Sequence, residues 1–414
     1  MRKLLIKGVL GVLSFNRFLL TRHPKLARLM FMPGLEILRW NIGKMKVYLE
    51  YARAKSQVPA YAKFLSKSEE NKINFRGLVP DLSKIPETSK DNYIREYSIA
   101  DRCKNGTINV NGVIVDESSG SSGQPTNWVR GLKERRENKK LLQLSFQKAF
   151  GMDNIFFINA FAMGAWATGV NVAISFADLA RMKSTGPDME KIESTLLQFG
   201  KMHNYVIFGY PPFLKKLVDE ASLNFSEYNV SFIFGGESMS ENMRSYLLDK
   251  GIKKVISSYG ASDLELNMAT ETDTTIAIRK LLISNKEFAK KLLKFDGALP
   301  MIFQYNPLDF VYESNADTEL VVSIARPNYL APKIRYNIKD RGHVIRKKEM
   351  LRVMKACNIN PDSVEGWNND LPFLLHYGRT DLTVSYYGAN IYTNDIQEVI
   401  FSIPELAANY SSFT

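Results

Sequence analysis

The sequence predicts an α/β protein, in which a large region of mostly parallel sheets with flanking helices is joined to a smaller antiparallel or barrel-like β sub-domain. Between about residues 154 and 271, short apolar runs alternate with amphipathic helical stretches, the pattern of a parallel sheet. From about residue 298, apolar runs follow one another closely, which favours antiparallel strands. With 414 residues, 45% of them hydrophobic, the chain can bury a large core.

The charge and cysteine content exclude several classes of protein. The net charge is +12, but the 13 Lys and Arg and two acidic residues of positions 1–65 supply +11 of it. The basic excess therefore belongs to one end of the chain, and we expect no nucleic-acid partner. Two cysteines are too few for a disulfide framework, and the four histidines lack the spacing of metal ligands. This usage suits a reducing compartment, the cytoplasm.

Residues 1–44 form a basic, apolar segment that we expect to be helical. Lys7 and Arg17 interrupt it, so it has no run of the ~20 apolar residues that a membrane span needs. It also has no clear signal-peptide cleavage site. Two interpretations stay open. In the first, residues 1–32 lie in an anionic membrane interface at the inner face of the membrane. In the second, the helix packs on the rest of the protein with its basic side solvated.

The first half of the chain predicts helices and one strand. Residues 45–65 have apolar positions at helical spacing, interrupted near Pro59. Thr88 or Ser89 is a candidate cap for a short helix. Residues 107–117 alternate as a strand, and residues 131–150 are rich in good helix formers.

The second half predicts repeated strand–helix units. Residues 154–176 indicate two buried strands around a glycine-containing helix start, and residues 205–221 a strand, a proline turn and a helix. A strand, a Gly-Gly turn and a helix capped by Ser240 follow in residues 230–251, and another strand begins near residue 254. The later strands are expected in MIFQYNP, DFVYES, TELVVSIA and KIRYNIKDRGHVI.

The loop SSGSSGQPT, residues 118–126, directly follows a predicted strand. Its hydroxyls and exposed backbone N–H groups suit phosphate oxygens. It is not a Walker loop, because Gln124 and Pro125 follow Gly123 where that motif has Lys-Ser/Thr. A solvated linker is the alternative interpretation of this loop taken alone.

Four further motifs follow this loop in order: FGGE (234–237), SSYGASD (257–263), IRYNIKD (334–340) and YGRTDL (377–382). The ordered set resembles the adenylate-forming superfamily of acyl-CoA synthetases and adenylation domains. It is most similar to the phenylacetate–CoA ligase branch and its capsule-biosynthesis-like relatives. The resemblance extends from about residue 45 to the end of the sequence.

The resemblance implies a ligase that uses ATP and Mg²⁺ to activate an aryl or fatty carboxylic acid. The acid becomes an acyl-adenylate with release of pyrophosphate, and the acyl group then passes to a thiol, with coenzyme A the first expectation. One alternative is an adenylating enzyme that loads a carrier protein or an amine. Another is a catalytically silent nucleotide-binding protein docked at a membrane.

The resemblance also implies roles for residues that contact the nucleotide. The loop residues that would hold the β- and γ-phosphates are Ser118, Ser119, Gly120, Ser121, Ser122, Gly123 and Thr126. The residues that would border the adenine are Gly235, Gly236, Glu237, Ser258, Tyr259 and Gly260. Asp340 would accept the ribose hydroxyls, and Arg379 would reach the ribose or a phosphate.

The remaining implied roles belong to the metal, the acid and a hinge. Asp263 would bind Mg²⁺ as a catalytic residue, and Asp381 would be the hinge of a C-terminal lid. The acyl pocket would be lined by Phe161, Ala162, Trp166, Ala167 and Ala261.

The sequence departs from the family pattern at several positions. Gln124 replaces a frequent Lys, Asp263 replaces Glu, and Leu382 stands where a second Asp is usual. Residues 382–414 contain no Lys, so the lysine of the family's lid is expected to be missing and the lid to be truncated. We therefore predict four segments: 1–44, an α/β nucleotide- and acid-binding core of 45–297, a β-rich sub-domain of 298–380, and a hinge with the start of a lid at 381–414.

Overall fold

The computed structural model describes residues 2–20, 34–68, 72–118, 125–151, 153–165, 167–295, 299–327, 329–367, 369–379, 384–386, 389–391 and 393–410. For residues 12–20, 148, 384–386, 389–391 and 393–395 it describes the backbone alone. The chain divides into two compact units. Unit 1 comprises residues 1–115, 128–136 and 304–376, and unit 2 comprises residues 116–127, 137–303 and 377–414. The predicted division into four segments, with boundaries after residues 44, 297 and 380, stays a prediction.

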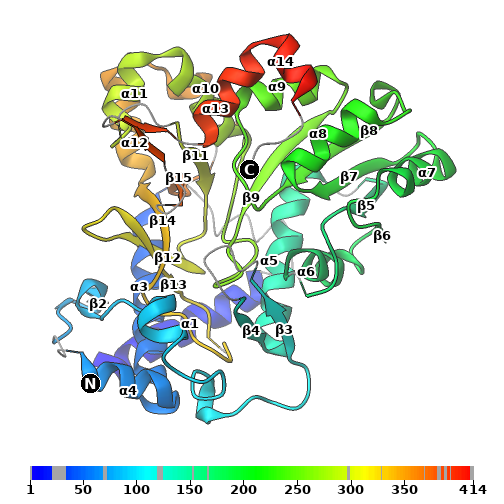
Figure 1. Ribbon diagram of the computed structural model, residues 1–414. Coiled ribbons are helices and arrows are strands. Elements are labelled where there is room, and N and C mark those ends of the chain that lie inside the picture. Colours follow the sequence, from blue (N-terminus) through cyan, green and yellow to red (C-terminus); the bar gives the residue numbers. More distant parts are fainter. Residues whose placement is uncertain are drawn as a thin grey trace. The chain divides into compact units, whose positions relative to one another are not determined.

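Unit 2 is built on a mixed sheet whose neighbouring strands follow the order β11-β10-β9-β8-β7-β5-β6 (Figure 1). The pairs from β6 to β9 are parallel, and β10 runs antiparallel to β9. The strands are β5 (Ile155–Asn159), β6 (Arg181–Ser184), β7 (Asn204–Gly209), β8 (Asn229–Phe234), β9 (Lys254–Tyr259), β10 (Ala269–Thr270) and β11 (Met301–Gln304). The predicted parallel α/β region is confirmed.

Along the chain, a helix lies between each two successive parallel strands from β5 to β9, as parallel pairing requires. The helices of this part of the chain are α5 (Leu132–Phe150), α6 (Ala167–Phe176), α7 (Met189–Phe199), α8 (Pro211–Glu220), α9 (Glu241–Asp249), α10 (Asp273–Ser284) and α11 (Lys286–Leu292). Near the end of the chain lie β16 (Val384–Tyr386), β17 (Ala389–Ile391), α13 (Thr393–Ser402) and α14 (Pro404–Asn409). A 3₁₀ turn, η5, covers Phe225–Glu227.

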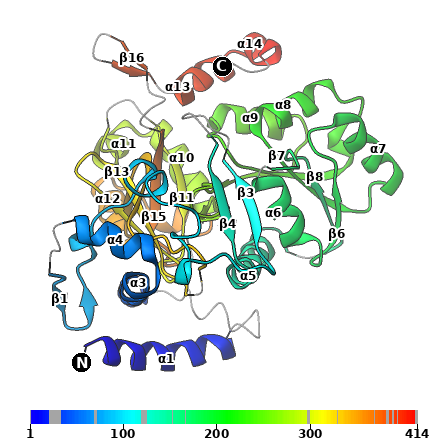
Figure 2. The same ribbon diagram turned by 60° about the horizontal axis from the view of Figure 1, so that its bottom comes forward.

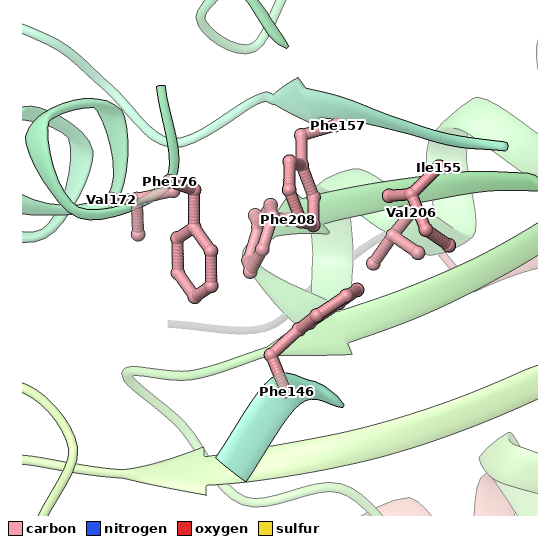
Figure 3. Close-up of a cluster of buried hydrophobic side chains, with 7 residues drawn as sticks. All are labelled: Phe146, Ile155, Phe157, Val172, Phe176, Val206 and Phe208. Atoms are coloured by element: carbon pink, nitrogen blue, oxygen red, sulfur yellow. The ribbon is translucent and has the colours of Figure 1, made fainter. Parts of the chain in front are cut away.

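The strands of unit 2 are covered on both faces. Phe157 of β5 contacts Phe146 of α5 and Phe176 of α6, with ring centroids 4.7 and 5.1 Å apart. The next residue along the strand, Phe156, meets Phe199 of α7 at 4.7 Å. Since successive side chains point to opposite faces of a strand, α5 and α6 cover one face and α7 covers the other. Figure 3 shows the cluster on the first face, formed by Phe146, Ile155, Phe157, Val172, Phe176, Val206 and Phe208.

The second strand predicted within residues 154–176 is wrong, because residues 167–176 form α6. The buried residues of α6 include Gly169, Val172 and Phe176, three to four positions apart, which is the spacing of one helix face. A Cβ on Gly169 would lie 2.2 Å from the carbonyl oxygen of Ala162. Small residues such as Gly169 therefore let α6 pack closely against the preceding segment. The apolar sequence alone resembles that of a buried strand.

Unit 1 contains three of the four strands expected after residue 298, whereas the strand expected in MIFQYNP is β11 of unit 2. Strand β13 (Glu319–Ile324) lies between β12 (Phe310–Ser314) and β14 (Tyr336–Ile345), antiparallel to both, and β15 (Phe373–Arg379) is the next strand in the order. The other elements from this part of the chain are α12 (Lys347–Ala356) and η6 (Pro361–Ser363).

The N-terminal part of unit 1 is helical. Helix α1 spans Arg2–Leu20, α3 spans Glu36–Gln57 and α4 spans Pro59–Lys67, so the predicted interruption at Pro59 is confirmed. The short elements are β1 (Phe75–Arg76), β2 (Val79–Pro80), η2 (Leu82–Lys84), the π-helical turn η3 (Lys90–Ile94) and η4 (Lys104–Gly106). Ser89 caps η3. The strand predicted over 107–117 is shorter, β3 (Ile114–Glu117), and β4 is Asn127–Arg130.

None of the helices in the described part of the chain is long and apolar enough to cross a membrane.

Cys103 is expected to resist alkylation by iodoacetamide in the native protein. Its side chain is fully buried, its thiol donates a hydrogen bond to the Ile99 carbonyl oxygen at 3.1 Å, and burial raises its pKa to about 11. The thiolate is the reactive species, so labelling at pH 8 should occur only after denaturation. Mass spectrometry of the Cys103 peptide before and after urea treatment checks this, and rapid native labelling of that peptide contradicts it.

Candidate functional site

Candidate site residues follow the ends of four neighbouring parallel strands of unit 2, and those after three of the strands were predicted. Strand β5 leads to Phe161, β8 to Gly235 and β9 to Gly260. Strand β7, between β5 and β8, leads to Tyr210. Because parallel strands end at one edge of their sheet, these residues gather at the edge where open α/β sheets bind ligands.

At the Gly-Gly turn, the predicted site residues Gly235, Ser258 and Phe161 lie close together. A Cβ on Gly235 would lie 3.1 Å from the Ser258 carbonyl oxygen and 4.0 Å from Cζ of Phe161. Gly236 has φ +92°, a left-handed conformation that favours glycine. The backbone of the turn after β8 therefore favours glycine at Gly236, and a close contact favours it at Gly235. The turn lies beside residues predicted to border the adenine and the acid.

Tyr210 is a site residue that the sequence analysis missed. Its hydroxyl donates a hydrogen bond to Oε1 of Glu237. Burial and that carboxylate raise the pKa of Tyr210 above its usual value, so the phenol stays a neutral donor that orients Glu237. A Cβ on Gly236 would lie 3.7 Å from the Tyr210 ring. The sequence could have indicated Tyr210 by its position immediately after a predicted buried strand, because other site residues also follow such strands.

The segment after β9 is fixed by its own hydrogen bonds. The Ser258 hydroxyl donates to Oδ1 of Asn267 at 3.0 Å, and the Tyr259 ring stacks on Phe303 with centroids 5.4 Å apart. Ala261 donates its N–H to the Glu265 carbonyl oxygen at 2.9 Å and accepts from the N–H of Leu264. Asp263 lies inside this tight turn and is largely buried.

Asp263 is the predicted magnesium ligand. No group of three or more His, Cys, Asp or Glu side chains in the described ranges could hold a metal ion. A single carboxylate is nevertheless compatible with Mg²⁺ at a nucleotide site, since that ion takes one or two protein carboxylates together with phosphate oxygens and water. The magnesium role of Asp263 therefore stays a prediction.

A buried cluster of charged side chains contacts both the segment after the Gly-Gly turn and strand β9. We call Glu241, Arg244, Glu271 and Arg279 the Arg–Glu cluster. Arg244 pairs with Glu241 at 3.0 Å and with Glu271 at 2.7 Å, and Arg279 pairs with Glu241 at 2.8 Å. All four side chains are at most 5% exposed.

The cluster also bonds directly to the backbone of both segments. Arg279 donates to the Met239 carbonyl oxygen at 2.6 Å, just after the Gly-Gly turn, and Glu271 accepts from the Ser257 N–H at 2.7 Å. Burial lowers the pKa of Arg244, but the carboxylates of Glu271 and Glu241 outweigh it and raise that pKa. The guanidinium therefore stays charged. Ser240 caps α9 beside the cluster, where its hydroxyl accepts from the Met243 N–H at 3.0 Å, as predicted.

The base of the Ser-Gly loop is closed by its two end residues. Ser118 donates its N–H to the Thr126 carbonyl oxygen at 3.0 Å, and the Thr126 N–H donates to the Ser118 hydroxyl at 3.1 Å. The predicted phosphate contacts of Ser119, Gly120, Ser121, Ser122 and Gly123 lie outside the described residues, as do Trp166 and Asp381.

Unit 1 holds the predicted ribose residue. Asp340 of β14 is buried, and its Oδ2 lies 3.1 Å from Nε2 of His376 on β15. Lys339, the residue before it, has φ +64°, which is uncommon for a residue with a Cβ. Its N–H is held by Oδ1 of Asn337 at 2.8 Å. Strand β14 is therefore irregular just before Asp340, where its register against β13 shifts. His376 was missed because no sequence pattern places it beside Asp340.

Three more predicted residues have defined places in the fold. Arg379 is the last residue of β15. Ala162 lies between β5 and α6, next to Phe161, and Ala167 is the buried first residue of α6.

No protein-family model and no curated protein matches this sequence. Solved structures do match. The structure of 2-hydroxyisobutyryl-CoA ligase in its postadenylation state aligns with a TM-score of 0.65 at 14% identity, covering 90% of this chain and 74% of that one. The two chains therefore share a fold. The same ligase in its thioesterification state, with 2-HIB-AMP and CoA, aligns with a TM-score of 0.62 over the same shares, also at 14% identity.

The shared fold confirms the α/β architecture predicted from the sequence. At 14% identity the likeness concerns the fold, because one fold can host unrelated functions. The adenylate-forming activity and the phenylacetate–CoA ligase-like branch therefore stay predictions.

Proposed function

We propose that this chain binds ATP with Mg²⁺ and activates a carboxylic acid as its acyl-adenylate. The observation that carries the proposal is the meeting of Gly235, Ser258 and Phe161 at the carboxyl ends of β8, β9 and β5. These three residues come from segments that were predicted to serve one reaction. They lie together at the end of the sheet where open α/β sheets bind ligands. The fold shared with 2-hydroxyisobutyryl-CoA ligase supports the same conclusion.

In this proposal the glycine turn and Tyr259 receive the adenine. Gly235 and Gly236 present backbone with no side chain in the way, and Tyr210 holds Glu237 through its hydrogen bond. Asp340 accepts the ribose hydroxyls, since an ionised carboxylate has lone pairs for two donors. His376 holds one oxygen of that carboxylate and acts as a positioning residue.

Residues 118–126 with Arg379 receive the phosphates, and Asp263 holds the magnesium ion. When bound, that ion neutralises phosphate charge. A carboxylate oxygen of the acid attacks the α-phosphorus of ATP, the bond to the bridging oxygen breaks, and pyrophosphate leaves. The product is a mixed anhydride of the acid and AMP. Holding both reactants in line supplies much of the rate acceleration.

The second half-reaction transfers the acyl group. A thiolate sulfur attacks the acyl carbon and AMP leaves, which gives a thioester. We propose coenzyme A as the thiol, and the aryl or fatty acid is placed near Phe161. Product analysis by mass spectrometry distinguishes acyl-CoA from an acylated carrier protein or an amide.

Asp340→Ala is expected to weaken ATP binding at least tenfold. Hydrogen bonds to a charged group contribute about 1.5–3 kcal/mol each, and about 1.4 kcal/mol corresponds to a factor of ten. Calorimetric titration of the protein with ATP and Mg²⁺ measures this. Asp317→Ala, an exposed carboxylate of the same unit, is the matched control and should bind as the parent does.

The proposal fails if the folded parent does not bind ATP, or if Asp340→Ala binds it equally well. A second assay separates binding from catalysis. Pyrophosphate release with a panel of aryl and fatty acids should show turnover with at least one acid. ATP binding without any acid-dependent release would favour the catalytically silent protein.

A further inference from the structure

The N-terminal helix α1 has two apolar faces, and only one of them packs on the protein. Ile6 is fully buried and Leu10 is 8% exposed, in a cluster with Ile42, Met45 and Leu308. We call Leu4, Leu5 and Val9 the outer face of α1. They are 72%, 51% and 40% exposed. Packing against unit 1 therefore explains one side of the helix and leaves the outer face unexplained.

The cations of α1 are placed beside these apolar residues. Arg2, Lys3 and Lys7 are all exposed. Lys3 and Lys7 are four residues apart, so they lie on one side of the helix. Residues 1–35 contain no Asp or Glu, so this segment provides no carboxylate to balance the cations. The result is an exposed apolar strip flanked by positive charge.

The position of α1 leaves this strip accessible. Figure 2 shows α1 along the outside of unit 1, with α3 on its inner side. The guanidinium of Arg2 also lies 5.1 Å from the centroid of the Phe75 ring. The helix is thus attached to the unit by Ile6, Leu10 and Arg2 while the outer face points away.

We propose that the outer face of α1 docks on an anionic membrane surface. An exposed apolar strip with flanking Lys and Arg suits a helix that lies in the plane of the headgroups, where the leucines enter the acyl boundary and the cations meet the lipid phosphates. The charge complementarity favours an anionic lipid surface over a second copy of this chain, because two such faces would bring like charges together. The proposal is independent of the ligase activity proposed above.

Co-sedimentation with lipid vesicles tests the proposal on the full chain. The parent should bind vesicles that contain phosphatidylglycerol and should bind pure phosphatidylcholine vesicles far more weakly. Binding to the anionic vesicles should weaken as salt rises, since salt screens exposed charges. Leu4→Ser/Leu5→Ser and Lys3→Glu/Lys7→Glu should each lower the bound fraction at least tenfold.

Matched variants in unit 2 serve as controls. Leu197→Ser/Met202→Ser replaces two exposed apolar side chains. Lys286→Glu/Lys290→Glu reverses two exposed charges at the same spacing on α11. Both should bind vesicles as the parent does.

Three outcomes would overturn the proposal. The parent could fail to bind anionic vesicles, or Leu4→Ser/Leu5→Ser could bind them as well as the parent. Sedimentation velocity could instead show a dimer that this double variant converts to a monomer, in which case the outer face is a subunit interface. Circular dichroism of each variant ensures that a loss of binding is not a loss of folding.

Discussion

Glu271→Ala is expected to destabilise the protein by about 3–5 kcal/mol, the cost of removing one partner from a buried ion pair. Glu271 is buried, and Arg244, its partner at 2.7 Å, is 3% exposed. With Glu271 gone, Glu241 alone would balance two buried guanidinium groups. The Ser257 N–H would also lose its acceptor, and an unpaired buried donor is costly.

The loss should extend to the site, because Ser257 lies two residues before Tyr259 in β9. Urea denaturation measures the change in the free energy of unfolding. Amide hydrogen exchange locates it, with faster exchange expected in residues 229–234 and 254–259. ATP binding should weaken in parallel, as the segments that are proposed to border the adenine lose their common support.

Two further variants make this result specific. Arg244→Met/Glu271→Leu removes both charges and keeps apolar volume, so it should be less destabilised than Glu271→Ala. Lys201→Ala/Glu227→Ala removes an exposed ion pair of the same unit and should leave the urea midpoint nearly unchanged. A Glu271→Ala protein as stable as the parent would mean that the cluster does not hold these segments.

The sequence predicted most of the elements that follow from local patterns. The apolar run at residues 205–209 forms a buried strand, as its composition predicts. Ser240 caps α9 because its hydroxyl accepts a hydrogen bond from the Met243 N–H. The error at residues 167–176 has a local cause. Small and β-branched residues suit a close-packed helix as well as a strand, and a short apolar run does not distinguish the two.

The missed site residues depend on contacts distant in the chain. His376 lies beside Asp340 only because their strands fold together, and the Arg–Glu cluster joins residues from 241 to 279. Charged residues are usually exposed, so their spacing gives no sign that they are buried together. The five motifs were found because each is a short run of residues with its own chemistry.

Gly260→Ala is expected to disrupt the turn that carries Asp263. A Cβ on Gly260 would lie 2.0 Å from the Leu266 carbonyl oxygen, 2.4 Å from its carbonyl carbon and 2.8 Å from its Cα. All three atoms are backbone, so no side chain can rotate to make room. Either the end of β9 or the segment near Leu266 must move, and overpacking of this kind costs about 1–3 kcal/mol or more.

The displacement should reach both neighbours of Gly260. Met268 donates its N–H to the Tyr259 carbonyl oxygen at 2.8 Å, and Ala261 is bonded to Glu265 and Leu264. Moving Leu266 therefore strains the hydrogen bonds that Tyr259 and Ala261 make with the segment around Leu266. We expect a lower urea midpoint and ATP binding at least tenfold weaker than that of the parent.

Two other glycines calibrate this effect. Gly235→Ala places its Cβ 3.1 Å from the Ser258 carbonyl oxygen, a contact that a few tenths of an ångström relieve, so its effect should be smaller. Gly11→Ala places a Cβ with no atom within 4 Å and should be neutral or slightly stabilising, because alanine favours helix. Equal urea midpoints and ATP affinities for all three variants would contradict the prediction. The order Gly260, Gly235, Gly11 would show that close backbone packing at the end of β9, and not glycine flexibility, shapes this edge of the site.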